Sequence, residues 1–218
     1  MLTFSEENYL KAIYHLEQPK SKHVSTNLIA DKMQTKASSV TDMLQRLSDK
    51  KLVDYKKYHG VKLSAKGEKI ATSVIRKHRL WETFLVNKLN FSWDEVHDVA
   101  EQLEHIQSER LVDSLDEFLE FPTVDPHGDP IPDKNGSITK QRKVKLSSLK
   151  INEQSILLNV KNSSDEFLRY LNKKNIAIGN TITVIAKETF DKSMQIKVDN
   201  KELMITDEVA QKLLVKEV

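Results

Sequence analysis

The positions of the prolines divide the chain into two parts with different secondary-structure patterns. Four of the five prolines in the 218 residues fall in one segment, FPTVDPHGDPIP, Phe121–Pro132. Because proline removes a backbone donor and cannot continue a helix, we expect an ordered turn there that leads into a linker. Before this segment apolar residues recur mainly at helical spacing, and after it short stretches resemble strands. The sequence therefore predicts a mostly α protein with a small β domain.

Two short helical patterns and two strand-like pieces lie close to the N-terminus. A helix is expected within residues 24–33 and is followed by a break at residues 34–36. The second helix has apolar residues at spacings of three, four and three, which predict one buried stripe: Ala37, Val40, Leu44 and Leu47. The strand-like pieces turn at His59 and Gly60. Helix, tight turn, helix and β-ribbon in this order indicate a winged helix-turn-helix.

The second of these helices has a polar face that suits DNA. Side chains that can reach base edges and phosphates gather there and on the wing: Lys36, Ser38, Ser39, Thr41, Asp42, Gln45, Arg46, Lys56 and Lys57. Residues 1–72 hold 13 basic and 8 acidic residues, a net charge of +5. Pattern and charge together predict binding to double-stranded DNA. A generic three-helix domain with a solvated, lysine-rich face is the alternative.

The middle of the chain is acidic and carries histidines and glutamates at helical spacing. Residues 73–140 hold 7 basic and 14 acidic residues. A long helix from about Ala65 carries His78 and Glu82 four residues apart. A second helix is expected over VHDVAEQLEHI, residues 96–106. Its spacing places four polar side chains on one face: His97, Glu101, Glu104 and His105.

Histidine and carboxylate side chains on neighbouring helices suit a divalent metal ion. The chain has no cysteine, which excludes thiolate ligands. Mixed imidazole and carboxylate donors fit iron(II), manganese(II), cobalt(II) or zinc(II), and the absence of sulfur favours the harder ions. The alternative is that these side chains form an ordinary solvated helix face.

Several motifs in a fixed order resemble the diphtheria toxin repressor family, which includes the manganese transport regulators. They are NYLKAIYHLE near the start, the winged pattern, RKHRLWE, VHDVAEQLEHI and DPHGDPIP. The resemblance covers the whole chain and implies a homodimeric repressor of metal homeostasis genes. Its co-repressor would be Mn2+ or Fe2+, and its partner a palindromic operator. The implied domains are a winged head at 1–72, a helical metal-binding and dimerisation domain at 73–140, and an SH3-like, FeoA-like β-barrel at 141–218.

The same resemblance implies two adjacent metal sites per subunit. The ancillary site would use His78, Glu82 and His97. The primary site would use Glu101, Glu104 and His105 with a residue of the first helix, which is Asn8 here. The family's barrel can lend a further ligand, and the matching residue is Glu166. Iron-type members have cysteine and manganese-type members have glutamate where this chain has Glu101.

Two residues of the first helix depart from the family pattern. Asn8 stands where the family has methionine or aspartate, so its amide oxygen could coordinate a metal but lacks charge. Lys11 stands where manganese regulators have a second acid. His97, by contrast, matches the iron-type branch better, so the chain combines features of both branches.

Four other histidines have no partner at ligand spacing, so we expect them at the surface or in turns: His15, His23, His59 and His127. No apolar run approaches the ~18 residues that span a membrane, and the N-terminus does not resemble a signal peptide. We therefore expect a cytoplasmic protein that does not associate with membranes.

Two other classes of function remain open. A metallohydrolase could use the histidine and glutamate cluster, but the chain shows no nucleophile motif and no glycine-rich phosphate loop. We therefore expect no enzymatic activity. The second alternative is a winged-helix regulator of a small organic ligand, in which the cluster has a structural role only.

Overall fold

The structure is a computed structural model that describes residues 2–17, 23–139, 141–161 and 164–217. The chain divides into two compact units, and the division falls within one helix, α4, Ala65–Leu89. The first unit comprises Met1–His78, Glu101–Asp113 and Pro132–Ile138. The second unit comprises Arg79–Ala100, Ser114–Ile131 and Thr139–Val218. The expected fold class, a mostly helical chain with a small β domain, is confirmed.

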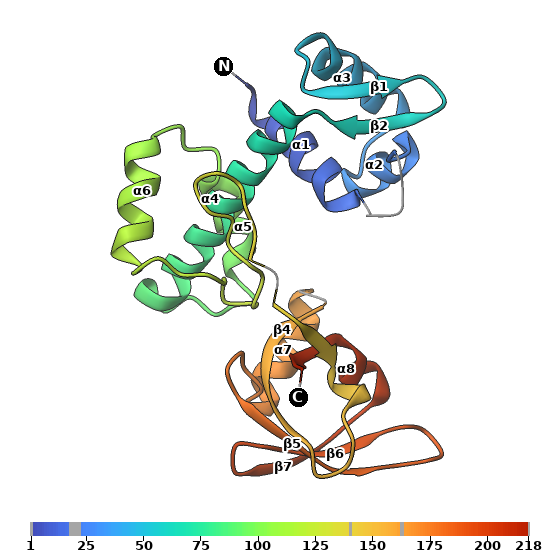
Figure 1. Cartoon of the computed structure of the whole chain (residues 1–218), viewed down its shortest axis with the longest axis vertical. Coiled ribbons are helices and arrows are strands. Elements are labelled where there is room, and N and C mark those ends of the chain that lie inside the picture. Colours follow the sequence, from blue (N-terminus) through green and yellow to red (C-terminus); the bar gives the residue numbers. More distant parts are fainter. Residues whose placement is uncertain (1, 18–22, 140, 162–163, 218) are drawn as a thin grey trace. The chain divides into compact units, whose positions relative to one another are not determined.

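The first unit contains the winged helix-turn-helix (Figure 1). Its elements are α1 Phe4–Leu16, α2 Thr26–Lys32, α3 Ala37–Asp49, β1 Val53–Lys56 and β2 Gly60–Leu63. Apolar side chains from all of them form one core, whose most buried members are Leu10, Ile13, Ile29, Val40, Leu44, Leu47 and Val61. Helix α1 is thus an integral part of the DNA-binding head. The expected stripe of α3 is buried except at Ala37, which is exposed because it is the first residue of the helix.

The wing is an antiparallel hairpin in which Lys56 pairs with Gly60. Gly60 has a φ of +90°, and a Cβ atom there would lie 2.5 Å from the carbonyl oxygen of Val24. Val24 forms a β-bridge with Val61 at this point. Glycine is therefore required both by the backbone conformation and by the close approach of the Val24 backbone.

Helix α5 is shorter than the sequence predicts. It spans Val96–Leu103, so Glu104 and His105 lie in the turn that follows and not on the helix. Helix α5 ends early because the chain turns before the next helix, α6, Glu109–Phe118. Ser108 accepts a hydrogen bond from the backbone N–H of Leu111 at 3.3 Å and so caps the start of α6. The chain must turn between the two helices, and this turn carries two of the predicted metal ligands.

The C-terminal part of the second unit is a small β-barrel domain. Its elements are β3 Lys143–Lys145, η1 Leu146–Ser148, β4 Gln154–Val160, α7 Asp165–Lys174, β5 Thr181–Lys187, β6 Met194–Val198, β7 Lys201–Ile205, α8 Asp207–Lys212 and β8 Leu213–Lys216. The strands form one antiparallel sheet in the order β3-β8-β4-β5-β6-β7. Figure 1 shows that this sheet is curved and that α7 and α8 lie beside it. Apolar side chains of both helices share one core with those of the strands. No helix in the described part of the chain has the length and apolar character needed to cross a membrane.

Candidate metal centre

The start of α1 is fixed by a capping box. The Thr3 hydroxyl accepts a hydrogen bond from the Glu6 backbone at 3.2 Å, and the Glu6 carboxylate accepts one from the Thr3 backbone at 3.0 Å. Lys50, directly after α3, contacts Glu6 at 2.6 Å. Burial opposes ionisation of Glu6, but the hydrogen bonds from Lys50 and Thr3 outweigh it and hold the Glu6 pKa below its usual value. These contacts anchor the first turn of α1 within the head.

Glu104 is a deeply buried carboxylate that contacts two other elements of the first unit. It is 1% exposed. Its Oε2 atom accepts hydrogen bonds from Lys11 Nζ on α1 and from His78 Nδ1 on α4, both at 2.6 Å. Burial raises the Glu104 pKa, but the hydrogen bond from His78 and the charge of Lys11 outweigh it, so the net pKa is lowered. Glu104 is therefore ionised and joins the turn after α5 to the head.

His105 is oriented by a carboxylate that the sequence did not reveal. Its Nδ1 atom lies 2.6 Å from Glu7 Oε2, and its ring stacks on Phe4 with centroids 4.6 Å apart. Gln107 donates to the other Glu7 oxygen at 3.0 Å. Donation from Nδ1 leaves Nε2 as an acceptor, 3.8 Å from Glu104 Oε1. A carboxylate that orients histidine in this way is the usual support for a metal-binding imidazole.

The side chain of Asn8 has a buried oxygen without a hydrogen bond. Among the described residues no donor contacts its Oδ1 atom. Lys11 lies three residues after Asn8 and four after Glu7 on α1, so its side chain is a helix-face neighbour of each. A buried polar atom without a partner is costly in protein alone but suits a metal ligand. An amide oxygen, like a carboxylate, is a donor type that suits a hard divalent ion.

Glu101 is the least buried of the donors in this part of the molecule. Its side chain is 54% exposed, and its Oε1 atom lies 3.8 Å from Lys11 Nζ. It occupies the last full turn of α5, one turn before Glu104 and His105. The structure thus brings Lys11, Glu101, Glu104 and His105 to one region of the first unit. Asn8 lies three residues before Lys11 on α1.

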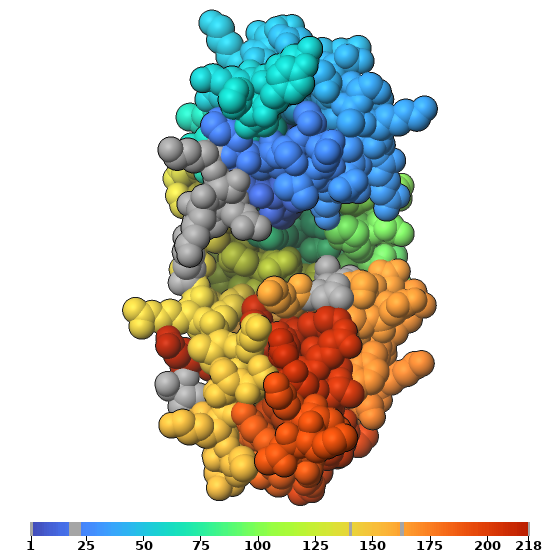
Figure 2. Space-filling model, turned by 90° about the vertical axis from the view of Figure 1, so that its right-hand side faces the viewer, coloured from blue at the N-terminus to red at the C-terminus, as the bar shows by residue number. Residues whose placement is uncertain are grey.

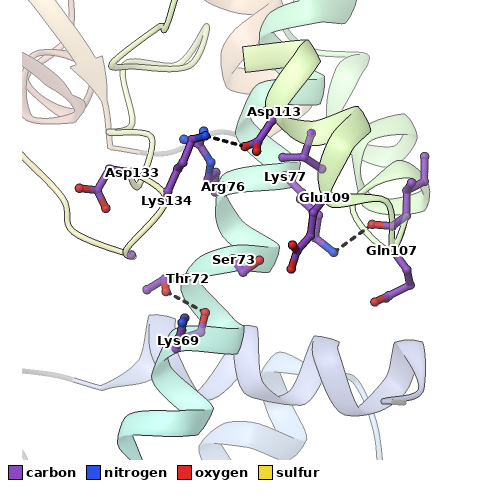
Figure 3. A pocket seen from close by; sticks show the side chains of 13 residues that line it. Lys69, Thr72, Ser73, Arg76, Lys77, Gln107, Glu109, Asp113, Asp133 and Lys134 are labelled. Atoms are coloured by element: carbon purple, nitrogen blue, oxygen red, sulfur yellow. Dashed lines mark hydrogen bonds and ion pairs between the residues drawn. The ribbon is translucent and has the colours of Figure 1, made fainter. Parts of the chain in front are cut away.

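The first unit also contains a pocket of about 320 Å³ (Figure 3). None of the predicted metal ligands lines it. Its charges largely compensate one another, as in the 3.3 Å ion pair of Lys134 with Asp113. Lys77 also lines it and is 8% exposed. Burial lowers the Lys77 pKa, although the charges of Glu7 and Glu104 oppose this. The pocket itself therefore has no marked preference for one sign of charge.

A second group of metal-donor side chains lies in the second unit. Glu82, Asp125 and His127 are all buried, and each offers a donor atom within 4.8 Å of the others. Glu82 Oε2 lies 3.8 Å from His127 Nδ1, and Glu82 Oε1 lies 3.4 Å from His97 Nδ1. His127 lies in a turn, which is one of the two predicted placements, and it is buried there, only 5% exposed.

The proline-rich segment positions this group. Asp125 Oδ1 accepts hydrogen bonds from the backbone of His127 and Asp129 at 2.8 and 2.9 Å, which closes a tight turn. Asn159 on β4 donates to the His127 carbonyl at 3.0 Å. A Cβ atom on Gly128 would lie 1.8 Å from the Leu158 carbonyl, so only glycine permits this contact. The turn is thus held against the barrel with His127 pointing toward Glu82.

Charges within the group shift two pKa values strongly. Burial, followed by the charges of Glu82 and Asp129, raises the Asp125 pKa to about 7. Burial opposes protonation of His127, but its hydrogen bond to Glu82 and the charges of Glu82 and Asp125 raise its pKa to about 9. The His127 Nε2 atom donates to the Trp93 carbonyl at 2.7 Å. Protonated His127 therefore supplies a positive charge beside the buried carboxyl groups of Glu82 and Asp125.

The remaining predicted ligands are placed as follows. His78 and Glu82 lie one turn apart on α4, and Glu82 contacts His97 on α5. Glu166 lies in the first turn of α7, exposed to solvent. Among the described residues no group of three donor side chains includes it. His15, His23 and His59 are exposed, as expected.

The predicted DNA-binding residues lie on the exposed side of the head, in the blue to cyan part of Figure 2. Val40, Leu44 and Leu47 face the core, and the polar residues of α3 lie opposite. Thr41 is half-buried, and the others are exposed: Lys36, Ser38, Ser39, Asp42, Gln45, Arg46, Lys56 and Lys57. Tyr58, which sequence patterns did not single out, lies at the tip of the wing and is 92% exposed.

A winged head connected to buried histidine and glutamate side chains defines a metal-responsive DNA-binding protein. Three family models match the chain in succession. The N-terminal DNA-binding domain of iron-dependent repressors matches residues 1–61. The metal-binding and dimerisation domain of iron-dependent repressors matches residues 64–133. The FeoA domain matches residues 144–217.

The chain is also similar to individual repressors and regulators in sequence and structure. The diphtheria toxin repressor of Corynebacterium jeikeium is 33% identical over 131 residues, 60% of this chain and 54% of the relative. The transcriptional regulator MntR of Oceanobacillus iheyensis is 32% identical over 121 residues, 56% of this chain and 81% of the relative. A solved manganese-dependent transcriptional repressor in complex with manganese has a TM-score of 0.83 and 31% identity, covering 98% of this chain and 100% of that one.

The chain belongs to the diphtheria toxin repressor and manganese transport regulator family of metal-dependent transcriptional repressors, in the form with a FeoA-like C-terminal domain. The resemblance in the sequence motifs is thereby confirmed. The chain spans about half the length of the first curated relatives it matches, 54% and 56%. The family consists of transcriptional repressors, so the metallohydrolase alternative is not supported.

Protonation of His127 predicts a pH dependence of stability without metal. The folded pKa of about 9 exceeds the ordinary value of 6.5. The resulting stabilisation is complete below pH 6.5 and is lost as the pH rises through about 9. In chelator, the melting temperature should fall between about pH 7 and about pH 9.5, and His127→Gln should reduce that fall. Differential scanning calorimetry measures it, with His15→Gln as an exposed control. A fall of equal size in wild type and His127→Gln would contradict the assignment.

Proposed function

We propose that this chain represses transcription when manganese(II) or iron(II) binds to it, by holding a homodimer in the form that binds a palindromic operator. The metal is an effector in this proposal, and no bond is broken. Its DNA partner places its activity in the cytoplasm. The proposed domains are the head at 1–72, the metal-binding and dimerisation domain at 73–140 and the FeoA-like domain at 141–218.

The observation that carries the proposal is the direct contact between donor residues and the DNA-binding head. Glu104 bonds to Lys11, and His105 bonds to Glu7, both on α1. Helix α1 in turn contributes Leu10 and Ile13 to the core that also holds α3. A change at the turn after α5 is therefore transmitted to the head through packed side chains.

The residues of the primary centre have distinct roles in this proposal. Glu104 and Glu101 supply carboxylate charge, Asn8 supplies a neutral oxygen and His105 supplies Nε2. Glu7 keeps the imidazole of His105 in the tautomer that leaves Nε2 free. A bound divalent ion supplies two positive charges to these donors. Because Asn8 lies on α1 and the others lie at the end of α5 or just after it, shared ligation would fix the head against the turn.

A second site per chain is part of the proposal. Glu82 is its central ligand, with His78 one turn before it on the same helix and His97 in contact. Asp125 and His127 extend this predicted set, because their donor atoms lie within 4.8 Å of those of Glu82. Glu166 stays a predicted additional ligand. Oxygen and imidazole donors without sulfur favour manganese(II) or iron(II).

DNA binding and dimerisation are assigned to separate surfaces. The exposed face of α3 would enter the major groove, and Lys56 and Lys57 on the wing would contact phosphates. In the second unit, large apolar side chains are exposed at Leu89, Phe118 and Phe121, by 51%, 58% and 62%. We assign these to contact with a second copy of the chain, in keeping with the dimerisation domain that matches this region.

Substitution of Glu104 tests the proposal. Operator fragments are first selected from genomic DNA by retention on the protein with manganese(II), and affinity is then measured by fluorescence anisotropy. In wild type, manganese(II) should raise affinity by about 5–150-fold over chelator, the usual range of allosteric coupling. In Glu104→Gln the increase should be less than about twofold, because the neutral amide cannot anchor the ion.

The matched control is Glu188→Gln, which removes the same charge from an exposed residue of the barrel domain and should behave as wild type. A full metal response in Glu104→Gln would contradict the proposal. It would favour regulation by a small organic ligand, with the cluster as a structural feature.

Two residues of the head should affect DNA binding in different ways. Gln45→Ala should cost about 1–3 kcal/mol and relax specificity at one base position, because glutamine reads a base edge. Lys57→Met should weaken binding to all sequences about equally and reduce the salt slope by about 1, because lysine contacts phosphate. Anisotropy against a panel of operator variants at several salt concentrations separates the two. Equal losses of specificity in both variants would contradict these assignments.

A further inference from the structure

The ammonium group of Lys11 lies among three atoms that can bind a metal ion. Its Nζ atom is 2.6 Å from Glu104 Oε2, 3.4 Å from His78 Nδ1 and 3.8 Å from Glu101 Oε1. The side chain of Lys11 is 14% exposed. Lys11 thus supplies a positive charge, from within the chain, at a point surrounded by imidazole and carboxylate donors.

The two oxygens of Glu104 point to different positions. Oε2 receives Lys11 and His78, and Oε1 lies 3.8 Å from His105 Nε2. His105 Nε2 is left free by the bond of its other nitrogen to Glu7. A carboxylate whose two oxygens face different positions can bind a cation at each of them at the same time. In this chain one of those cations is already the lysine.

We propose that Lys11 is a tethered cation that occupies one of two cation positions in the primary centre, so that this centre takes one divalent ion and not two. This inference rests on the proposed function, because it assigns the other position to the effector metal. That ion is held by Glu104 Oε1, His105 Nε2 and the Asn8 oxygen, while Lys11 stays on Glu104 Oε2.

The charge balance supports this assignment. Glu104 is 1% exposed, and a buried carboxylate without a cation is strongly unfavourable. Lys11 meets this need when no metal is present and keeps α1 beside the turn after α5. Removal of the ammonium group would leave Glu104 Oε2, Glu101 Oε1 and His78 Nδ1 together. Three such donors with water completing the shell are sufficient for a divalent ion.

The test is the number of manganese ions bound per chain. Lys11→Met should bind about one ion more than wild type in equilibrium dialysis, because three protein donors with water complete a site. The additional ion would share Glu104 with the first, so the manganese(II) electron paramagnetic resonance spectrum should show coupling between neighbouring ions. Wild type should lack both the additional ion and the coupling that this ion adds. Lys11→Gln should give the same result, and its amide can still donate to Glu104, which protects the fold without metal.

Two further variants act as controls. Lys11→Arg keeps the charge and should bind the same number of ions as wild type. Lys173→Met removes an exposed lysine of the barrel domain and should also match wild type. In chelator, the melting temperature of Lys11→Met should fall below that of Lys11→Arg, because only arginine still neutralises Glu104.

The outcomes separate the inference from the proposed function. An additional ion with a coupled spectrum in Lys11→Met and Lys11→Gln supports the inference. An unchanged number of ions in both variants overturns it and leaves the proposed function intact. An additional uncoupled ion also overturns it, because that ion lies away from Glu104. A wild-type protein that binds no manganese(II) or iron(II) overturns the proposed function itself.

Discussion

The structure of the first unit depends on a buried negative charge at Glu104. A carboxylate that is 1% exposed must be neutralised where it lies, and the groups that do so come from α1 and α4. Lys11 supplies the ammonium group and His78 the imidazole. Because α1 is also part of the core of the winged head, the same charge links the donor residues to the DNA-binding surface. In the proposed function, the metal acts on the head through this link.

The second unit also contains buried carboxylates, but a different kind of side chain neutralises them. Glu82 and Asp125 are buried close together, and the charge of Glu82 contributes to the raised Asp125 pKa. Here protonated His127 supplies the positive charge, and Arg79 lies 3.5 Å from Asp125. In the first unit the positive charge beside the buried carboxylate comes from Lys11. In the second unit it comes from protonated His127. A neutral histidine can act as a metal ligand, whereas the ammonium group of lysine has no acceptor atom.

The fold class and family followed from local sequence patterns, because helix spacing, capping residues and turn residues act over short ranges. The site depended on long-range contacts. Glu7 and His105 are 98 residues apart, so no spacing rule could pair them. The burial of His127 arises from the barrel strand against which its turn packs. Helical spacing predicts a helix as far as residue 106, but α5 ends at Leu103 because the chain turns before the Ser108 cap of α6. The ligand set and domain limits remain predictions.

The most direct test of the central claim is amide hydrogen exchange of α1, Phe4–Leu16, with manganese(II) and with chelator, in the absence of DNA. If metal binding fixes the head against the turn that carries Glu104 and His105, exchange in α1 should slow on addition of metal. Strand β6, Met194–Val198, serves as an internal reference and should not change. The protection of α1 should be absent in Glu104→Gln. Equal exchange in α1 with and without bound metal would contradict the account.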